Sequence, residues 1–307
     1  MRWLDHREAV ADPLRGAVIA LGNFDGFHRG HQAVAGEAIS WAQAEGRPSI
    51  IATFDPHPVR FFKPGVPPFR LTTLEQRQEL YLAAGATAML VFHFDGELAS
   101  TSARDFISKI LIERFGAHGV VTGADFTFGQ GAKGNVELLR DYGAECGLES
   151  RVVDAVAHEG VISSSRIRDA LRDGDPQLAA ELLTRPFAIR GIVEHGDKNG
   201  RKLGFPTANV SIESYLRPKY GVYAVTGKVL ATGEELKGAA NIGIRPQFTP
   251  PKELLEPFFF DFSGDLYGQE IEVAFHHFLR GEAKFDSLDA LMEQMERDCE
   301  EAKRLLG

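Results

Sequence analysis

The hydrophobic pattern of roughly the first 186 residues alternates between runs that suit strands and runs that suit helices. Apolar runs with the length of buried strands occupy residues 17–21, 49–54, 87–92, 119–123 and 149–156. Helical periodicity is found over residues 32–46, 72–85, 102–116, 135–147, 165–174 and 176–183. This alternation predicts right-handed crossovers and a mostly parallel sheet, with ligands at the carboxyl ends of its strands.

Start signals support two of these helices. Thr72, followed three residues later by Glu75, predicts a capping box at the start of the helix over residues 72–85. Ser102 is expected to cap the helix over residues 102–116.

From about Phe187 onward the pattern changes to successive strands, separated by turns that are rich in Gly, Pro and Asp. Strand-like runs occupy residues 188–196, 220–230, 235–244, 255–262 and 270–279. The one convincing helix covers residues 287–306, with an apolar stripe formed by Leu288, Leu291, Met292 and Met295. We therefore expect a Rossmann-like α/β domain over residues 1–184 and an all-β domain over residues 185–307. The second domain should be a small antiparallel barrel with a terminal helix.

Charge and cysteine content narrow the classes of partner. A formal net charge of −9 argues against nucleic acid or an anionic membrane surface as the main partner. Cys146 and Cys299 lie far apart and form no CxxC pair, which argues against a disulfide framework or a zinc site. The charged N-terminal stretch does not resemble a signal peptide, and no apolar run has membrane-spanning length. We expect a cytoplasmic protein.

The sharpest chemical signal is the stretch GNFDGFHRGHQ at residues 22–32, between the first strand and the first helix. If the helix begins near Arg29, His28 and His31 are neighbours at its first turn, where unpaired N–H groups and a positive dipole suit a phosphate. Gly30 would let the backbone approach a ligand closely. A lone pair of this kind is more typical of a helix cap, and a metal site would need a third ligand nearby.

A second element that suits phosphate is ISSSRIR, at residues 162–168. Three consecutive serines stand at another expected helix start, and Arg166 and Arg168 add guanidinium groups. A serine cluster before a helix is usually only a cap. In the same α/β domain as HxGH, however, it suggests a clamp for the β- and γ-phosphates of a nucleotide.

With these stretches the chain resembles the prokaryotic bifunctional riboflavin kinase/FMN adenylyltransferase family, also called FAD synthetase. HxGH alone is shared with many nucleotidylyltransferases, whereas GRKLGFPTANV followed by NIGIRP is highly specific. The matching stretches cover nearly the whole chain in family order: GNFDGFHRGHQ, TFDPHP, LTTLEQR, GADFTFG, ISSSRIR, GRKLGFPTANV, YGVYAV, NIGIRP, DLYG and FLRGEAKFDSLDAL.

The resemblance implies that the first domain is a nucleotidylyltransferase that joins AMP from ATP to FMN, giving FAD and pyrophosphate. His28 and His31 would stabilise the charge that develops at the α-phosphorus, and Arg168 would hold the departing pyrophosphate. Asp25, in the same loop, is interpreted as a turn residue. Further contacts to ATP are expected from Gly22, Asn23, Phe24, Gly30, Ser163, Ser164 and Ser165.

The flavin needs a flat apolar slot, and aromatic residues near expected strand ends are candidates for its walls. The candidates are Phe54, Phe62, Phe126 and Phe128, with Asp125 as a polar anchor. Any single phenylalanine is more often part of a core, so each keeps that alternative. His57, in TFDPHP, is equally well explained as an ordinary loop residue.

The resemblance also implies that the second domain phosphorylates riboflavin with ATP to FMN. Thr207 and Asn209 are two residues apart, so on an extended segment both side chains point to one face, where their oxygens suit Mg²⁺. Glu256 would be the base for the ribityl 5′-hydroxyl, with Glu253 as a competing candidate. The ATP of this reaction is expected at a turn-rich loop that is not a P-loop, with contacts from Gly196, Lys198, Gly200, Arg201, Gly204 and Pro206.

A few positions depart from the usual family pattern without touching a residue assigned to chemistry. Ser165 and Gln247 each stand where threonine is usual, and Thr184 stands where glycine is usual. Pro250 and Pro251 replace more typical glycines and should stiffen their loop.

Two other functions remain as alternatives. One is a monofunctional riboflavin kinase with a degenerate first half, which the intact His28, His31, Ser164 and Arg168 disfavour. The other is a flavin- or nucleotide-binding regulator, or an RNA-associated HxGH protein. The acidic charge and the missing KMSKS-like loop disfavour the RNA-associated protein. The expected partners are ATP, riboflavin, FMN and FAD, with no nucleic acid, no membrane and no obligate protein partner.

Overall fold

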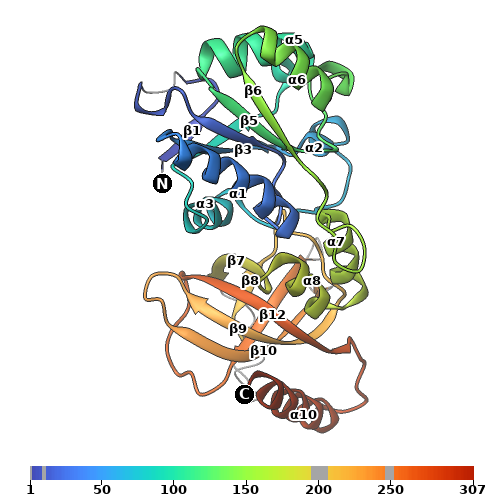
Figure 1. Cartoon of the computed structure of the whole chain (residues 1–307). Coiled ribbons are helices and arrows are strands. Elements are labelled where there is room, and N and C mark those ends of the chain that lie inside the picture. The colour runs from blue at the N-terminus through green and yellow to red at the C-terminus, as the bar shows by residue number, and fades with distance from the viewer. Residues whose placement is uncertain (1, 9–11, 195–206, 246–251) are drawn as a thin grey trace. The chain divides into compact units, whose positions relative to one another are not determined.

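The structure is a computed structural model of the chain and describes residues 2–8, 12–194, 207–245 and 252–307. The chain forms two compact units, which are drawn in Figure 1. The first unit contains Met1–Pro67 and Thr73–Ser163, and the second contains Pro68–Thr72 and Ser164–Gly307. The short segment 68–72 therefore belongs to the second unit although the flanking sequence belongs to the first.

The first unit is a parallel sheet with helices on both faces, as the alternating pattern predicted. Its strands are β1 (Arg2–Asp5), β2 (Val18–Leu21), β3 (Ser49–Asp55), β4 (Ala88–His93), β5 (Gly119–Gly123) and β6 (Glu149–Val153). Its longer helices are α1 (Arg29–Ala44), α3 (Leu74–Ala83), the wide π-helical segment η2 (Phe106–Arg114) and α6 (Val136–Glu145). Its short helical turns are η1 (Asp12–Leu14), α2 (Pro58–Phe62), α4 (Gly96–Ser100), α5 (Ala103–Asp105) and η3 (Gln130–Ala132).

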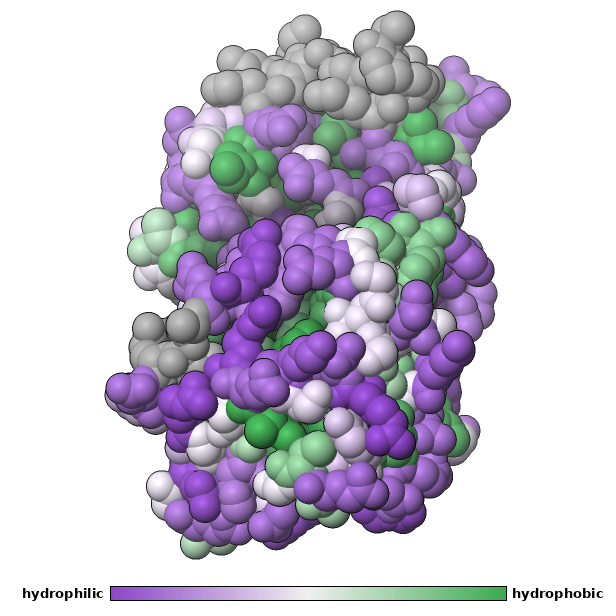
Figure 2. Space-filling model, turned by 90° about the horizontal axis from the view of Figure 1, so that it is seen from above, coloured by the Kyte–Doolittle hydropathy of each residue, from purple (hydrophilic) through white to green (hydrophobic). Residues whose placement is uncertain are grey.

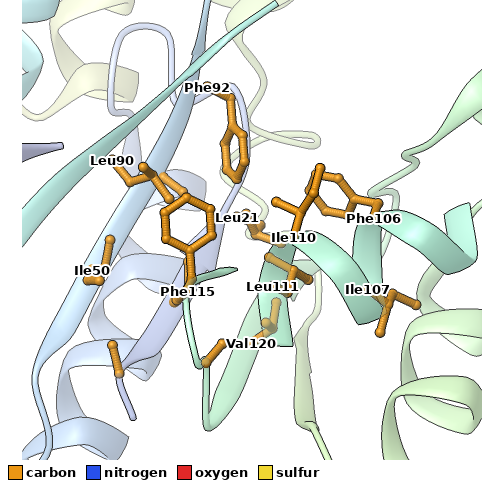
Figure 3. Packing of buried hydrophobic residues seen from close by; sticks show 14 of the residues in the cluster. Leu21, Ile50, Leu90, Phe92, Phe106, Ile107, Ile110, Leu111, Phe115 and Val120 are labelled. Carbon is orange, nitrogen blue, oxygen red and sulfur yellow. The ribbon is translucent and has the colours of Figure 1, made fainter. Parts of the chain in front are cut away.

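A hydrophobic core lies on each face of this sheet, because successive strand residues point to opposite faces. On one face, strand residues such as Leu21, Leu90 and Phe92 pack against the apolar side of η2 (Figure 3). On the other face, α1 and Tyr81 of α3 cover a second cluster that includes Val18 and Ile51. Strands that are buried on both faces read as continuous apolar runs, and this explains the pattern in the sequence.

The order of the strands fixes where the loops that carry chemistry meet. The sheet runs β1-β4-β3-β2-β5-β6 with parallel pairing throughout. Its winding therefore reverses between β2 and β5. Ligands of open α/β sheets bind outside the carboxyl ends of strands at such a point. The loop after β2 contains the histidine pair, and the loop after β5 contains GADFTFG, so both candidate loops lie at this edge.

The second unit is a closed antiparallel barrel with helices packed on it. Its strands are β7 (Phe187–Glu194), β8 (Asn209–Ser211), β9 (Gly221–Val229), β10 (Glu235–Arg245), β11 (Lys252–Phe259) and β12 (Glu270–Gly281). The barrel order is β10-β11-β8-β7-β12-β9, with antiparallel pairing at every junction. Its helices are α7 (Ser164–Asp173), α8 (Pro176–Leu183) and α10 (Leu288–Leu306). The predicted fold class of both halves is confirmed.

Three contacts attach the additional elements of the second unit to the barrel. Helix α8 buries Ala179, Leu182 and Leu183 and packs against β7 and β12. Ala302 of α10 packs against Ala224 and Ala239 of the barrel wall. The segment 68–72 is held by the backbone, because Arg70 N–H donates to the Ser214 carbonyl at 3.2 Å and the Arg70 carbonyl accepts from Leu216 N–H at 2.8 Å.

Some details differ from the sequence-based expectations. Thr73, not Thr72, caps α3, and the capping box closes with Gln76 instead of Glu75. Thr72 is itself buried and belongs to the second unit, so it is not available at the helix end. Strand β1 was missed, because its four residues carry only two apolar side chains between two charged ones, which is too short for a recognisable run. The domain boundary at 184/185 stays a prediction.

The face of the molecule drawn in Figure 2 is mostly hydrophilic, with apolar residues in separate areas among polar ones. Within the described parts of the chain, none of the helices has both the length and the hydropathy that a membrane crossing requires.

Candidate active sites

The loop between β2 and α1 has an unusual backbone. Phe24, Gly26 and Phe27 all adopt positive φ angles, of 47°, 86° and 45°. For a phenylalanine this left-handed region is uncommon and costs energy, so the surrounding structure has to hold it. Both aromatic rings are buried and contact the ring of Tyr81 on α3, with centroid distances of 6.2 Å for Phe24 and 4.9 Å for Phe27.

His28 and His31 lie together at the start of α1, as the sequence predicted. Helix α1 begins at Arg29 with His28 as its N-cap, and the two imidazole rings stack with centroids 3.6 Å apart. His28 Nδ1 accepts the backbone N–H of His31 at 3.3 Å. Because Nδ1 is an acceptor, the proton of the neutral His28 ring is on Nε2, which can donate to a ligand oxygen.

The other predicted residues of this loop have mixed roles. Gly22 and Gly30 leave room for neighbouring rings, since a Cβ on Gly22 would lie 3.1 Å from the Phe24 ring and one on Gly30 would lie 3.2 Å from the His28 ring. Phe24 packs edge-on against His31 with the centroids 5.2 Å apart. Phe24 thus supports the histidine from within the core, and Asn23 is exposed at the loop surface.

Asp25 is more than a turn residue. Its side chain is 2% exposed and pairs with Arg77 of α3, which is 3% exposed, over a distance of 2.9 Å. Arg77 also donates to Thr53 Oγ1 at 2.9 Å and to the Asn23 carbonyl at 3.3 Å. Thr53 of β3 in turn donates to the same Asn23 carbonyl at 2.7 Å. One guanidinium group therefore connects α3 and β3 to the loop between β2 and α1, which we call the histidine loop.

The residues of the predicted second phosphate element divide between the two units. Ser163 belongs to the first unit, in which the carbonyl of Ile162 lies 3.7 Å from the position of a Cβ on Gly30. Ser164, Ser165 and Arg168 belong to the second unit, at the start and on the first turns of α7. There, Arg168 Nε donates to the Phe69 carbonyl at 2.9 Å, and its guanidinium carbon lies 4.9 Å from the centre of the Phe69 ring. The role of these residues toward ATP stays a prediction.

The flavin candidates of the first unit lie partly in the core. Phe54 and Phe128 are 8% and 7% exposed and belong to the cluster under η2, so the alternative reading of core residues describes them. Phe126 is partly buried and stacks on Phe128, with centroids 5.7 Å apart. Phe62 is 62% exposed and contacts Phe94 edge-on. Asp125 is exposed beside Gly123 at the end of β5.

The kinase candidates meet on one face of the barrel wall. In the pairing of β10 with β11, Asn241 lies directly opposite Glu256. The pairing of β11 with β8 continues the register from Leu255 opposite Val210 to Glu256 opposite Asn209, and Ala208 N–H donates to the Pro257 carbonyl at 2.9 Å. Residues opposite each other in a sheet share a face, so Glu256 lies between two asparagine side chains. Thr207 is half-buried just before β8.

Glu253, the competing candidate for the base, is engaged elsewhere. It lies three residues from Glu256 and therefore on the opposite face of β11. Its carboxylate accepts from Arg217 Nη2 at 2.8 Å and from the Tyr220 hydroxyl. The Arg217 guanidinium and the Tyr220 hydroxyl hold the pKa of Glu253 below its usual value, which makes it a weak proton acceptor. These contacts disfavour Glu253 as the base, and the role of Glu256 stays a prediction.

Several predicted kinase residues lie outside the described residues. These are the ATP-binding candidates Gly196, Lys198, Gly200, Arg201, Gly204 and Pro206, together with Gln247, Pro250 and Pro251. Among the residues that the structure describes, no group of three or more His, Cys, Asp or Glu side chains could hold a metal ion. The hydroxyl of Thr207 and the amide oxygen of Asn209 are hard ligands that fit a magnesium ion shared with nucleotide phosphates.

Two residues of interest were not found from the sequence. Arg77 lies within LTTLEQR, and the sequence predicts only that it belongs to a helix, because a single sequence does not distinguish a buried arginine from an exposed one. Its position one helical turn before Tyr81 was the available signal. Asn241 begins NIGIRP, and only the strand register shows that it lies opposite Glu256.

A histidine pair at the first helix of a Rossmann-like sheet places the first unit in the HxGH class of nucleotide-binding α/β proteins. The model of the FAD synthetase family matches residues 11–166, and that of the riboflavin kinase family matches residues 183–306. The chain belongs to the family of bifunctional riboflavin kinase/FMN adenylyltransferases, since it matches both models in order and close relatives bear that name.

Two of these relatives show the extent of the similarity. The bifunctional riboflavin kinase/FMN adenylyltransferase of Escherichia coli (strain K12) is 40% identical over 301 residues, which cover 96% of this chain and 94% of that protein. The protein of the same name from Bacillus subtilis (strain 168) is 39% identical over 296 residues, covering 94% and 92%. A crystal structure described as a macrolide-efflux protein from Streptococcus pneumoniae superposes with a TM-score of 0.88 at 30% identity, over 99% of both chains.

Proposed function

We propose that this chain phosphorylates riboflavin with ATP to FMN in its second unit and adenylylates FMN with ATP to FAD in its first unit. The observation that carries the proposal is the stacked pair His28 and His31 at the start of α1, at the reversal point of a parallel sheet. Membership of a family whose named relatives are bifunctional supports both activities in one chain. A chain with only the kinase activity would have no need for this arrangement.

In the first reaction site, the FMN phosphate attacks the α-phosphorus of ATP in line, and pyrophosphate leaves. Negative charge grows on the phosphate oxygens during this step, and His28 Nε2–H is a donor that can stabilise it. His31, stacked on His28, is positioned to share the role. The helix start adds unpaired N–H groups and a positive dipole end. No covalent intermediate with the protein is needed, because positioning and charge stabilisation suffice.

The proposal also assigns the remaining contacts to ATP and to the flavin in the first site. Gly22, Asn23, Phe24 and Gly30 form or line the ATP loop, and Ser163, Ser164, Ser165 and Arg168 hold the β- and γ-phosphates. The isoalloxazine ring is proposed to lie against Phe62 and Phe126, with Asp125 as a polar contact and Phe54 and Phe128 supporting the slot from the core.

In the second reaction site, Glu256 accepts the proton of the ribityl 5′-hydroxyl as the γ-phosphoryl group is transferred to that oxygen. Thr207 and Asn209 would hold Mg²⁺, which neutralises phosphate charge when it is bound. Asn241, opposite Glu256, is placed to orient the same hydroxyl. The nucleotide contacts assigned to Gly196, Lys198, Gly200, Arg201, Gly204 and Pro206 remain part of this proposal.

The location and partners follow from the same assignment. We propose a cytoplasmic enzyme that meets ATP, riboflavin, FMN and FAD as small molecules, without nucleic acid, membrane or an obligate protein partner. The alternative of a flavin- or nucleotide-binding regulator would predict binding without turnover, so the test is an assay of products.

The experiment incubates the purified protein with riboflavin, ATP and Mg²⁺ and separates the flavins by chromatography. Wild-type protein should form FMN and then FAD. His28→Ala should accumulate FMN and lose roughly 100-fold or more in the rate of FAD formation, the usual effect of removing one donor to a developing charge. Asn209→Ala should abolish FMN formation but still convert supplied FMN to FAD. The activity that each variant retains shows that the unit without the substitution is folded, and the fluorescence of Trp3 and Trp41 checks the first unit of His28→Ala. FAD formation at the wild-type rate by His28→Ala would refute the first site.

A further inference from the structure

The backbone of the histidine loop adopts a conformation that its own residues do not favour. Three of its residues adopt left-handed conformations within four positions, and two of these are phenylalanines, for which the region is unfavourable. Among its own backbone groups, Phe27 N–H donates to the Phe24 carbonyl at 3.1 Å. Contacts from other elements must therefore maintain the conformation that presents His28 and His31.

Arg77 contributes several polar contacts to this support, together with Thr53 and Gln32, which donate to the Asn23 and Phe27 carbonyls. The guanidinium of Arg77, on α3, donates one hydrogen bond to the Asp25 carboxylate and another to the Asn23 carbonyl of the loop. A third contact, to Thr53, fixes the same guanidinium to β3. The apolar contacts of the loop involve the same helix, because Phe24 and Phe27 pack on Tyr81, one turn further along α3. Movement of Arg77 would release the loop on both sides of Asp25.

The pair also has an electrostatic consequence. Asp25 lies three residues before His28, in the loop proposed to receive a triphosphate, and its side chain is 2% exposed. An unpaired carboxylate there would be poorly screened by water and would repel the nucleotide phosphates. The Arg77 guanidinium cancels that charge at 2.9 Å while leaving the histidine donors as the groups that a phosphate meets.

We propose that Asp25 and Arg77 are positioning residues for adenylyl transfer: the buried pair keeps the histidine loop in its left-handed conformation and removes a negative charge beside the nucleotide. The proposal rests on the proposed function of the first unit. Neither residue touches the reacting atoms, so both act through His28 and His31.

A role that is only structural makes a different prediction. If Arg77 merely stabilises the fold, its removal should reduce FAD formation by the same factor whether or not the histidines are present. If Arg77 acts through the histidines, its removal should matter little once a histidine has already been lost, because effects of groups that act as a unit are not additive.

The experiment is a double-mutant cycle on FMN to FAD conversion by the full chain. Arg77→Met should lower kcat/KM for ATP by roughly 100-fold, the loss expected when catalytic groups move by about an ångström. In the background of His31→Ala, the same substitution should cost less than about threefold. The double variant Asp25→Asn with Arg77→Met should recover at least about tenfold over Arg77→Met, chiefly in KM for ATP, because the uncompensated charge is gone.

Controls separate the possible failures. Arg140→Met breaks an exposed ion pair with Asp141 in the same unit and should leave both activities unchanged. Because the substitutions lie in the first unit, the fluorescence of Trp3 and Trp41 in that unit reports whether each variant is folded. Arg77→Lys replaces Arg77→Met if the latter does not fold. Equal effects in the wild-type and His31→Ala backgrounds, or a folded Arg77 variant with unaltered kcat/KM, would overturn the proposal alone. Wild-type protein that forms no FAD would overturn the proposed function itself.

Discussion

Single hydrogen bonds decide what the titratable side chains of this protein can do. His28 Nδ1 accepts a backbone N–H, so its Nε2 carries the proton that a phosphate can use. Arg217 and Tyr220 hold Glu253 as a carboxylate, which makes it a weak proton acceptor. His6 shows the same principle away from the active sites, because its Nδ1 accepts the His93 backbone N–H at 2.9 Å.

His6 should make the stability of the first unit depend on pH. Burial lowers the pKa of His6 below its ordinary value near 6.5, and the nearby Arg7 and Arg114 act in the same direction against Asp5 and Asp95. The unfolded chain therefore takes up this proton first as the pH falls. Stability that is fully present above about pH 6.5 is lost between that pH and the lower pKa of the folded state.

The measurement is urea unfolding at pH 7.5 and 5.5, followed by the fluorescence of Trp3, which lies in β1 three residues before His6. His6→Asn keeps an acceptor for His93 but does not titrate, so it should remove a loss on the order of 1 kcal/mol from the pH difference. An equal loss in wild type and variant would assign the pH dependence to other groups.

Residue roles were predictable from the sequence where a motif names them and not where burial decides. The HxGH spacing and the end of the apolar run suffice to place His28 and His31 at a helix start. Asp25 and Arg77 lie 52 residues apart, and nothing local to either shows that they meet. Phe54 and Phe128 illustrate the opposite case, because strand-end aromatics look alike in sequence whether they line a slot or fill a core.

The elements followed their local signals closely. Helix α1 begins at the expected residue, and Ser102 and Asp175 accept N–H groups at the starts of α5 and α8. The cap of α3 is one residue later than expected, because two neighbouring threonines stand at the helix start and the sequence alone does not distinguish between them. Helix α10 was predicted from its apolar stripe, yet its polar contacts with the barrel were not.

The docking of α10 should depend on one buried ion pair. Asp298 is 7% exposed and accepts two N–H groups from Arg280 of β12, the shorter at 2.7 Å. Asp298→Ala leaves the guanidinium without its carboxylate and should destabilise the second unit by about 3 kcal/mol.

The matched control is Glu301→Ala on the same helix, which removes an exposed pair with Arg304 and should cost less than about 1 kcal/mol. Urea unfolding followed by far-ultraviolet circular dichroism measures both. Both tryptophans, Trp3 and Trp41, lie in the first unit, so their fluorescence should stay unchanged and confirm that the effect is confined to the second. Equal costs for the two variants would show that apolar contacts alone hold the helix.

Two hydrophobic patterns in the sequence predicted the fold class of the two halves, because continuous apolar runs and alternating runs lead to different sheets. These patterns could not show that α7, α8 and the segment 68–72 belong to the second unit. Helices look alike in sequence whichever sheet they cover, and a five-residue segment carries no pattern at all. Contacts distant in sequence, such as Leu216 N–H to the Arg70 carbonyl at 2.8 Å, decide the membership.

Fragments of the chain should reflect this division. A fragment of residues 164–307 keeps α7 and α8, whereas one of residues 185–307 exposes the barrel surface that Leu182 and Leu183 cover. Burying one such side chain contributes about 1.5–3 kcal/mol, so the shorter fragment should be less stable by roughly 3 kcal/mol or more. Thermal unfolding and riboflavin phosphorylation compare the two, and equal stability would show that α8 is dispensable to the barrel.

The two sheets also differ in how they meet other molecules. A closed barrel has no free strand edge, so strand-to-strand aggregation of the folded protein through the described strands is left to β1 and β6, at the margins of the parallel sheet. On β6 the side chain of Arg151 is tied to Glu37 at 2.8 Å and lies 4.0 Å from the centre of the Trp41 ring. Together with Glu149, this charge on the edge strand β6 disfavours pairing with a strand of a second copy, which would extend the sheet.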